Sequence, residues 1–187
     1  MSAYKELGLL AEQIVNTEDT TRADPEYLRT PTDLAQYLHR WNILLGQEPT
    51  VDDLVAVRDL RRRLRAVFEA SDAAVAVARL NDLLADVWVH PLIALLPDGQ
   101  ITRHLVVGQD LPVACRLAAE AALGLSDALG QYGIERFRVC NAAPCTDVFI
   151  DTSRNQSRRY CCEQCANRHN VAIHRRRHKT AEHELDR

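Results

Sequence analysis

Four cysteines near the C-terminal end of the chain constrain its structure more than any other feature. Cys140 and Cys145 are separated by four residues, Cys161 and Cys165 by three, and fifteen residues lie between the two pairs. This spacing is close to the C-x2-C-x15–20-C-x2-C pattern of zinc sites, with each pair slightly longer. Zn²⁺ takes four soft ligands at the corners of a tetrahedron, and two short loops brought together by a hairpin can supply them. The spacing therefore predicts a zinc site.

The segment that carries these cysteines has little else to hold it in shape. Leu, Ile, Val and Phe are sparse between Arg138 and Cys165. Metal binding would therefore supply much of the folding free energy of this segment. Two disulfides are the alternative. Residues 1–15 contain no long apolar run of the kind that a secretion signal has, so we expect a cytoplasmic protein, and disulfides are rare in the cytosol.

Spacing alone leaves the third ligand open. Cys162 gives the more usual C-x2-C spacing with Cys165, whereas Cys161 gives C-x3-C. His169, His174 and His178, on a predicted helix, are possible substitute ligands. His174 and His178 are four residues apart, so they share a helix face and could bind a metal. Because four thiolates already complete the metal shell, we favour a solvated role for these histidines.

The residues around the cysteines resemble the CGNR zinc finger. Residues 149–155 read F-I-D-T-S-R-N, residues 158–161 read R-R-Y-C, and residues 165–168 read C-A-N-R. The family signature is F-x-D-x-S-x-N, R-R-[WY]-C and C-G-N-R, so Ala166 replaces the glycine of the motif. The resemblance implies that the zinc ligands are Cys140, Cys145, Cys161 and Cys165.

The N-terminal part is similar to the ABATE domain, which usually precedes this finger. Its landmarks are Asn16-Thr17 after an apolar run, L-x-T-P-x-D-L at residues 28–34, R-D-L-R at 58–61 and L-N at 80–81. The two resemblances cover nearly the whole chain and imply a stress-linked transcription regulator. We expect an ABATE-like α+β domain at residues 1–135 and a zinc finger with a basic C-terminal helix at residues 136–187.

Charge is distributed unevenly between these two parts. Residues 136–187 carry eleven Lys and Arg against six Asp and Glu, a net charge of +5, whereas residues 1–135 carry twelve against twenty, a net charge of −8. Four thiolates on one Zn²⁺ would lower the effective charge of the finger to about +3. A basic end on an acidic body is typical of a nucleic-acid contact module. The chain has no apolar stretch of the roughly 18 residues that span a membrane, so we expect no membrane partner.

Local signals predict an α+β fold: a mostly helical N-terminal domain with a small β-hairpin, then a small treble-clef-like or ribbon-like finger. Thr30 with Asp33, and Thr50 with Asp53, have the spacing of helix capping boxes. Asp98-Gly99 is a strong hairpin turn signal. Residues 4–15 are predicted to form a helix, or a helix that runs into a strand. Further helices are predicted at 31–45 (ended by Gly46), after the capping signal at 50–53 with inward residues from Leu54 to Phe68, and at 73–86, 111–129 and 162–179. Strands are predicted at 92–96, 101–107, 137–139 and 148–150.

The last of these helices is the predicted DNA-contacting element. Arginine can pair bidentately with guanine in the major groove, and further Lys and Arg can anchor phosphates. The candidate DNA-contacting residues are Arg154, Arg158, Arg159, Arg168, Arg175, Arg176, Arg177 and Lys179. The alternative is that these side chains pair with the acidic N-terminal body and hold the two parts together.

Other candidates concern small molecules and redox chemistry. Asn16 and Thr17 are candidates for binding a small-molecule effector, although capping of neighbouring elements is the simpler interpretation. The arginines at positions 58, 61, 62, 63 and 65 could bind an acid or a phosphate, but we favour a solvated helix face paired with nearby Asp and Glu. Cys115 is expected to be a small core residue. A homodimer is compatible with these predictions.

Two other functions compete with a DNA-binding regulator. One is a small-molecule-binding protein whose zinc module is purely structural. The other is a thiol-based redox switch, suggested by Cys162 beside Cys161. We expect no enzymatic activity, because H-E-x-x-H, a phosphate-binding glycine loop and G-x-S-x-G are all absent from the sequence. Four cysteine ligands would also leave zinc without an open position for water.

Overall fold

The N-terminal part is built mainly from helices, as the sequence predicts. The computed structural model describes residues 3–41, 43, 47–85, 87, 89–95, 99, 101–107 and 111–185. The helices and the first hairpin are α1 (Ala3–Val15), α2 (Pro31–Arg40), α3 (Val51–Phe68), α4 (Ala73–Leu84), β1 (Val89–Leu95), β2 (Ile101–Val107) and α5 (Val113–Tyr132). The C-terminal part consists of η1 (Ile134–Arg136), β3 (Phe137–Val139), β4 (Val148–Ile150) and α6 (Glu163–Leu185). The α+β fold class is confirmed.

Both predicted capping boxes are present. Thr30 and Asp33 exchange side-chain-to-backbone hydrogen bonds at the start of α2, and Thr50 and Asp53 do the same for α3. Helix α2 is shorter than predicted. It ends at Arg40 because the N–H groups of residues 41 and 43 both bond to the carbonyl of Leu38, which closes the last turn. The predicted stop at Gly46 lies outside the described residues.

Helix α5 ends later than predicted. It continues through Gly130 to Tyr132, and Gly133 is the capping residue, with its N–H bonded to the carbonyl of Leu129. Gly133 has φ +81°, a left-handed conformation that glycine adopts without steric cost. Helix α5 is therefore capped at Gly133.

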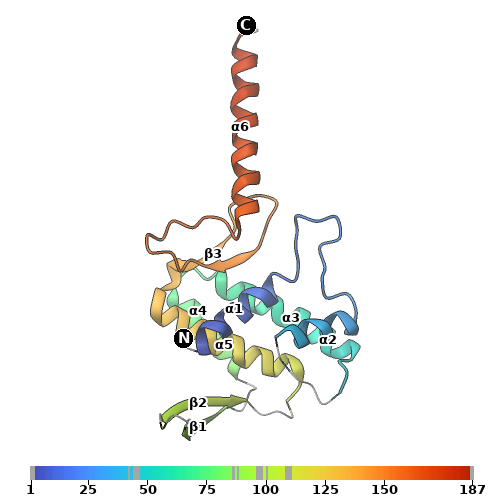
Figure 1. Cartoon of the computed structure of the whole chain (residues 1–187), viewed down its shortest axis with the longest axis vertical. Coiled ribbons are helices and arrows are strands. Elements are labelled where there is room, and N and C mark those ends of the chain that lie inside the picture. The colour runs from blue at the N-terminus through green and yellow to red at the C-terminus, as the bar shows by residue number, and fades with distance from the viewer. Residues whose placement is uncertain are drawn as a thin grey trace.

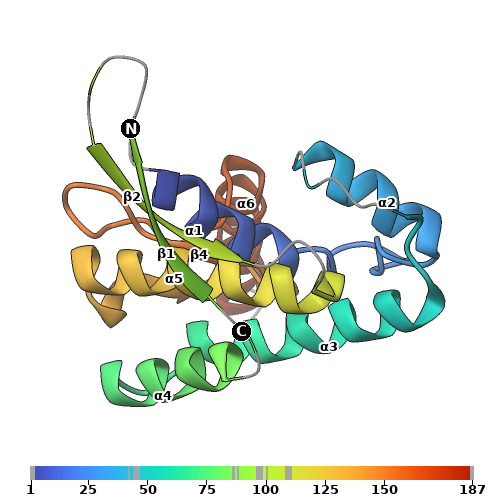
Figure 2. The same cartoon turned by 90° about the horizontal axis from the view of Figure 1, so that it is seen from below.

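The core lies between two layers of helices. Helices α1 and α5 lie side by side, and α3 and α4 pack beneath them (Figure 2). Ile14, Leu64, Leu117 and Leu125 are fully buried where these helices meet. Burial of apolar surface at such contacts is the dominant favourable term in folding.

The same core continues into the C-terminal part. Phe137, Val148 and Ile150, from β3 and β4, belong to the hydrophobic cluster of the helices. The ring of Phe137 packs on Phe68 of α3, with ring centroids 5.4 Å apart. The short hairpin that leads to the cysteines is therefore seated on the helical body.

The first hairpin lies at the opposite end of the molecule from α6 (Figure 1). Strands β1 and β2 pair antiparallel, from Val89↔Val107 to Leu95↔Ile101. Gly99 in the predicted turn has φ +82°. Among the described residues, no helix is both long and apolar enough to cross a membrane.

Candidate metal centre and its surroundings

A two-stranded hairpin and a helix bring the four cysteines together. Strands β3 and β4 pair antiparallel, with Phe137 opposite Ile150 and Val139 opposite Val148. The pairing extends into the connecting loop, where the N–H of Cys140 donates to the carbonyl of Asp147 at 2.8 Å. Because this loop is closed at its base, its two cysteines face the start of α6. Helix α6 carries the fourth cysteine in its first turn.

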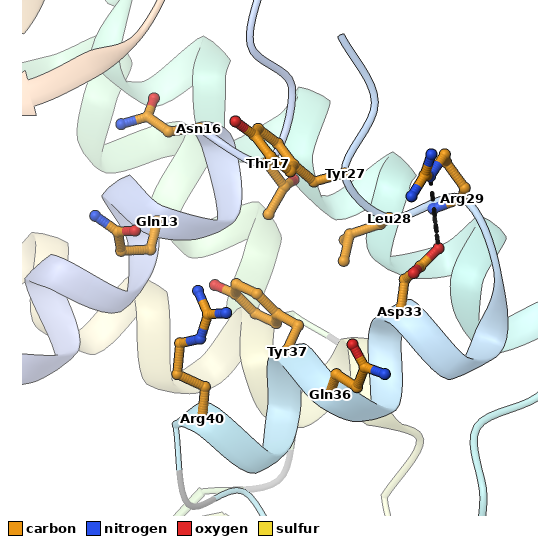
Figure 3. Close-up of a pocket in the computed structure, with 10 residues that line it drawn as sticks. All are labelled: Gln13, Asn16, Thr17, Tyr27, Leu28, Arg29, Asp33, Gln36, Tyr37 and Arg40. Atoms are coloured by element: carbon orange, nitrogen blue, oxygen red, sulfur yellow. Dashed lines mark hydrogen bonds and ion pairs between the residues drawn. The ribbon is translucent and has the colours of Figure 1, made fainter. Parts of the chain in front are cut away.

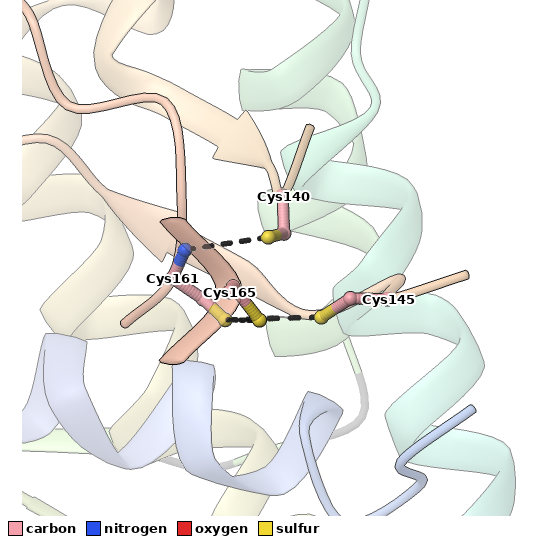
Figure 4. Close-up of side chains that lie close together, drawn as sticks. All are labelled: Cys140, Cys145, Cys161 and Cys165. Atoms are coloured by element: carbon pink, nitrogen blue, oxygen red, sulfur yellow. Dashed lines mark hydrogen bonds between the residues drawn. The ribbon is translucent and has the colours of Figure 1, made fainter. Parts of the chain in front are cut away.

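The cysteine sulfurs have the spacing of a tetrahedral metal shell. The Sγ atoms of Cys140, Cys145, Cys161 and Cys165 all lie within 4.8 Å of one another (Figure 4). The Sγ of Cys161 is 3.7 Å from that of Cys145 and 3.5 Å from that of Cys165. Zn–S bonds of about 2.3 Å in a regular tetrahedron place sulfurs roughly 3.8 Å apart. The donor set therefore fits Zn²⁺ in charge, softness and size.

Cys162 lies outside this cluster. Its side chain is exposed, and its Sγ is 3.8 Å from that of Cys161. The sulfur cluster includes Cys161 instead, which is half-buried. The fold thus favours the ligand that the family resemblance implies over the one that the C-x2-C spacing favours.

Hydrogen-bond donors surround the sulfurs. The backbone N–H of Cys161 donates to the Sγ of Cys140 at 3.4 Å, and Arg168 Nη2 donates to the Sγ of Cys165 at 3.2 Å. The same Nη2 also donates to the carbonyl of Ala142 at 3.2 Å. Outer-shell donors of this kind orient metal ligands and tune their basicity. Arg168 therefore ties the first turn of α6 to the loop that carries the first cysteine pair.

The thiols differ in how readily they ionise. Burial raises the pKa of Cys145 to about 12. Burial and a hydrogen bond to Asp147 raise the pKa of Cys161 as well. Burial also opposes ionisation of Cys140, but hydrogen bonds from the backbone of Cys161 and Ala142 outweigh it and lower the pKa of that thiol. A metal ion must therefore displace protons as it binds.

A buried aspartate organises the segment between the two cysteine pairs. Asp151 accepts hydrogen bonds from the N–H and the hydroxyl of Ser153, at 2.9 and 2.5 Å, and from the N–H of Arg158 at 3.1 Å. Arg136 and Arg138 lie 3.9 and 3.8 Å from its carboxylate. Burial opposes ionisation of Asp151, but these hydrogen bonds and charges lower its pKa. This network explains the D-x-S part of the motif at residues 149–155.

Helix α1 completes the hydrogen bonding of β4. The Nδ2 of Asn16 donates to the carbonyl of Val148 at 2.9 Å, and its Oδ1 accepts the N–H of the same residue at 2.8 Å. One turn earlier, Glu12 accepts the N–H of Ile150 at 2.8 Å. The predicted ligand-binding residue Asn16 thus joins the two parts of the chain. Glu12 was missed from sequence, although its i,i+4 spacing from Asn16 places both on one helix face.

Further contacts join the helical body to the first cysteine pair. Thr20 donates to the carbonyl of Pro144 at 2.6 Å, and Arg65 of α3 donates to the carbonyl of Thr146 at 2.7 Å. Both acceptors lie in the loop between β3 and β4. Contacts with the helical body therefore fix this loop from two sides, independently of a metal.

The arginine cluster on α3 is only partly solvated. Arg61 is 8% exposed and forms a bidentate ion pair with Glu26, at 2.9 and 2.7 Å, and a third bond to Thr17. Arg58 donates to the carbonyl of Leu28. The predicted pairing with an acidic residue is therefore present at Arg61, but this side chain is not solvated, because the segment before α2 folds over it and supplies the carboxylate. Thr17 is occupied by this contact and by a bond to Ile14.

A cavity of about 450 Å³ lies between α1, α2 and the segment that connects them (Figure 3). Asn16 and Thr17 line it, together with Tyr27, Tyr37 and Arg40. The two residues predicted to bind a small molecule therefore do border a cavity, although their polar groups bond to protein. Leu28, Arg29 and Asp33, from the L-x-T-P-x-D-L motif at residues 28–34, line the cavity as well.

The predicted DNA-contacting arginines fall into two groups. Arg158 donates to the carbonyls of Tyr160 and Cys161 and stacks on the ring of Phe149 at 4.6 Å, so it holds the finger together, as Arg168 does. By contrast, the side chains of Arg154, Arg159 and Arg175 are exposed. They have no ion pair within the described part of the chain.

Helix α6 runs away from the helical body for most of its length (Figure 1). Residues 170–173 and Arg175 are exposed. Arg176, Arg177 and Lys179 lie further along the same helix, and their side chains are outside the described set. The ion pairs of finger arginines that the structure describes go to Asp151 within the finger. Arg158 acts electrostatically on Glu12 of α1, but among the described residues no ion pair joins Arg154, Arg159 or Arg175 to the acidic body.

A helical domain followed by a hairpin and helix that gather four cysteines defines a two-part protein of the zinc-finger type. The sequence profile of the CGNR zinc finger matches residues 136–178. That of ABATE, described as "Putative stress-induced transcription regulator", matches residues 8–131. The chain therefore belongs to the ABATE family and carries a CGNR zinc finger, which confirms both resemblances. Comparison with curated proteins finds no match. Both families are regulator or zinc-finger types rather than enzymes.

Proposed function

We propose that this protein is a zinc-dependent transcription regulator that contacts DNA through its C-terminal finger and α6. One observation carries the proposal: α6 starts at the cysteine cluster and then extends away from the body with an exposed arginine on it. A helix of this kind fits the major groove of B-DNA, which is about 12 Å wide. Its basic side chains suit a phosphate-lined partner.

Zinc would be bound by Cys140, Cys145, Cys161 and Cys165. With four thiolate ligands the site is closed, so the metal would be structural and would fix the start of α6 against the β3–β4 loop. Arg168 and Arg158 would hold the loops around the metal. The boundary between the helical domain and the finger would fall near residue 135.

DNA contacts would then come from basic residues of α6 and of the loop before it. Arg175, Arg176, Arg177 and Lys179 would contact DNA from α6, and Arg154 and Arg159 would reach the phosphate backbone from the loop before it. Arg158 and Arg168 would contribute indirectly, by positioning these elements. The protein would act in the cytoplasm of a cell without a nuclear compartment.

Titration of the zinc-loaded protein with labelled genomic fragments across a range of salt concentrations tests the proposal. Arg175→Ala should weaken binding and reduce the salt slope by about one unit, as expected for loss of one phosphate contact. Arg62→Ala removes one charge from an exposed arginine of α3 and is the matched control. Equal affinities of the two variants, or no binding by the wild-type protein at low salt, would count against DNA contact.

The N-terminal domain would supply the regulatory input, through a small molecule or a protein partner. The cavity between α1 and α2 favours a small molecule, because it is of the size that small ligands occupy. Screening of metabolites by thermal shift tests this role. A stabilising compound whose effect is lost on mutation of the cavity would support it, and stabilisation that survives such mutation would place the ligand elsewhere.

A further inference from the structure

The cavity between α1 and α2 has an uneven polar lining. On one wall, Asp33 accepts hydrogen bonds from the backbone of Thr30 and of Arg29, so its carboxylate is occupied. The guanidinium of Arg29 is paired with Asp24 at 3.1 Å and lies 3.9 Å from Asp33. The guanidinium of Arg29 is therefore already matched by two carboxylates.

Further along the same wall, α2 carries an unpaired cation and a hydroxyl whose proton has no acceptor. Arg40 is exposed and has no ion pair with any residue that the structure describes. The hydroxyl of Tyr37 is buried, and no residue of the described chain accepts its proton, because the nearby indole of Trp41 can only donate a hydrogen bond. A buried polar group without a partner costs free energy, and a bound ligand can supply the missing partner.

Arg40 and Tyr37 lie close together on this wall. They are three positions apart on α2, which places them on one helix face, and Figure 3 shows both side chains directed to the cavity between Gln13 and Leu28. Burial raises the pKa of Tyr37, whereas a hydrogen bond from the side chain of Trp41 and the charge of Arg40 oppose that rise. The phenol therefore stays protonated at neutral pH and can act as a donor.

We propose that this cavity binds a small organic monocarboxylate, with the carboxylate on Arg40 and the hydroxyl of Tyr37 and an apolar body against Leu28 and the tyrosine rings. One unpaired guanidinium matches one negative charge, and a guanidinium with an adjacent hydroxyl donor matches the two oxygens of a carboxylate. A phosphate group carries more charge than the single free cation balances. The rings of Tyr27 and Tyr37 supply apolar surface that an inorganic anion cannot use.

The site lies beside the joint between the two parts of the chain. Asn16 borders the cavity and bonds to Val148 of β4. This inference extends the regulatory input of the proposed function, but its test does not depend on DNA. Ligand binding is measured on the protein alone, so failure of the cavity proposal and failure of the DNA proposal are separate results.

Calorimetric titration of the full-length, zinc-loaded protein with benzoate and with 4-methylpentanoate tests the proposal. Benzamide, which has the shape of benzoate without its charge, and inorganic phosphate are the control ligands. We expect at least one acid to bind, with benzamide and phosphate at least about tenfold weaker. Arg40→Gln should weaken acid binding at least about tenfold and Tyr37→Phe by roughly threefold to tenfold. Arg62→Gln, outside the cavity, should leave binding unchanged.

Three results would overturn the proposal. The first is that neither acid gives binding heat at about 10 times 1 mM, where 1 mM is the range of weak ligands. The second is that benzoate and benzamide bind equally well. The third is that wild type and Arg40→Gln bind the acids equally well. Thermal unfolding of each variant serves as the folding check. Both substituted side chains keep their approximate size, so neither is expected to disturb the core.

Discussion

Asn16 forms both of its amide hydrogen bonds with a single residue, Val148, which lies 132 positions further along the chain. The amide thereby pairs with the edge of β4 as a neighbouring strand would. Together with Glu12, it makes α1 part of the support of the finger. The two family domains are thus joined by specific bonds as well as by a shared core.

Removal of the Asn16 amide should loosen this joint. Asn16→Ala leaves the N–H and the carbonyl of Val148 without their partners, so we expect a loss of about 2–3 kcal/mol in the free energy of unfolding. Gln13→Ala, an exposed amide on the same helix, is the matched control and should change stability little. Urea unfolding measures the stability, and hydrogen exchange at the Val148 amide localises the effect. Equal stability of the two variants would show that the joint does not depend on Asn16.

Glu12 should make the protein less stable as pH rises from about 4.5 to about 7. Burial raises the pKa of Glu12 to about 7, while the hydrogen bond from Ile150 and the charge of Arg158 oppose the rise. Since the unfolded state has the lower pKa, it releases this proton first, and folding stability falls between about pH 4.5 and 7.

Glu12→Gln tests this effect, because the amide oxygen can still accept the N–H of Ile150. The variant should gain stability over wild type, and the gain should grow by about 2 kcal/mol between pH 5.5 and pH 8. Glu48→Gln, at an exposed position, controls for the change in net charge. A gain that is the same at both pH values would contradict the argument.

The choice of third metal ligand predicts opposite results for two adjacent cysteines. Cys161→Ser should lower zinc affinity by more than the roughly 10–100-fold that loss of an outer-shell partner costs. Cys162→Ser should leave it nearly unchanged, because that side chain is exposed outside the sulfur cluster. Competition with a chromophoric chelator measures both. The reverse pattern would assign the ligand to Cys162.

Substitution of Arg168 should lower zinc affinity, whereas substitution of Arg175 should not. Arg168→Ala removes a donor to the Sγ of Cys165 and should lower zinc affinity by about tenfold. Arg175→Ala should not affect zinc, because that side chain is exposed two turns further along α6. Chelator competition on both variants separates positioning of the metal site from contact with DNA. Equal zinc affinities would remove the role assigned to Arg168.

Local patterns predicted those features whose cause is local. The threonine–aspartate caps at Thr30 and Thr50 lie within four residues, and both were confirmed. The family motif likewise placed Cys161 in the cluster. The end of α2 at Arg40 was missed because a backbone bond to Leu38 closes it, and backbone bonds leave no mark on side-chain periodicity.

Long-range contacts account for what sequence reasoning did not find. The partner of Arg61 is Glu26, 35 positions away, so the pattern of α3 alone gave a solvated face. Glu12 and Asn16 act on a strand far along the chain. Tyr37 and Arg40 are ordinary residues of an amphipathic helix until α1 and the connecting segment close a cavity over them.

The central claim is that four cysteines hold one zinc ion and thereby fix the start of α6. X-ray absorption at the zinc edge, together with elemental analysis of the purified protein, tests it most directly. We predict one zinc per chain with four sulfur neighbours at about 2.3 Å. Protein purified without zinc, or a spectrum that requires nitrogen or oxygen neighbours in place of one or more sulfurs, would contradict it.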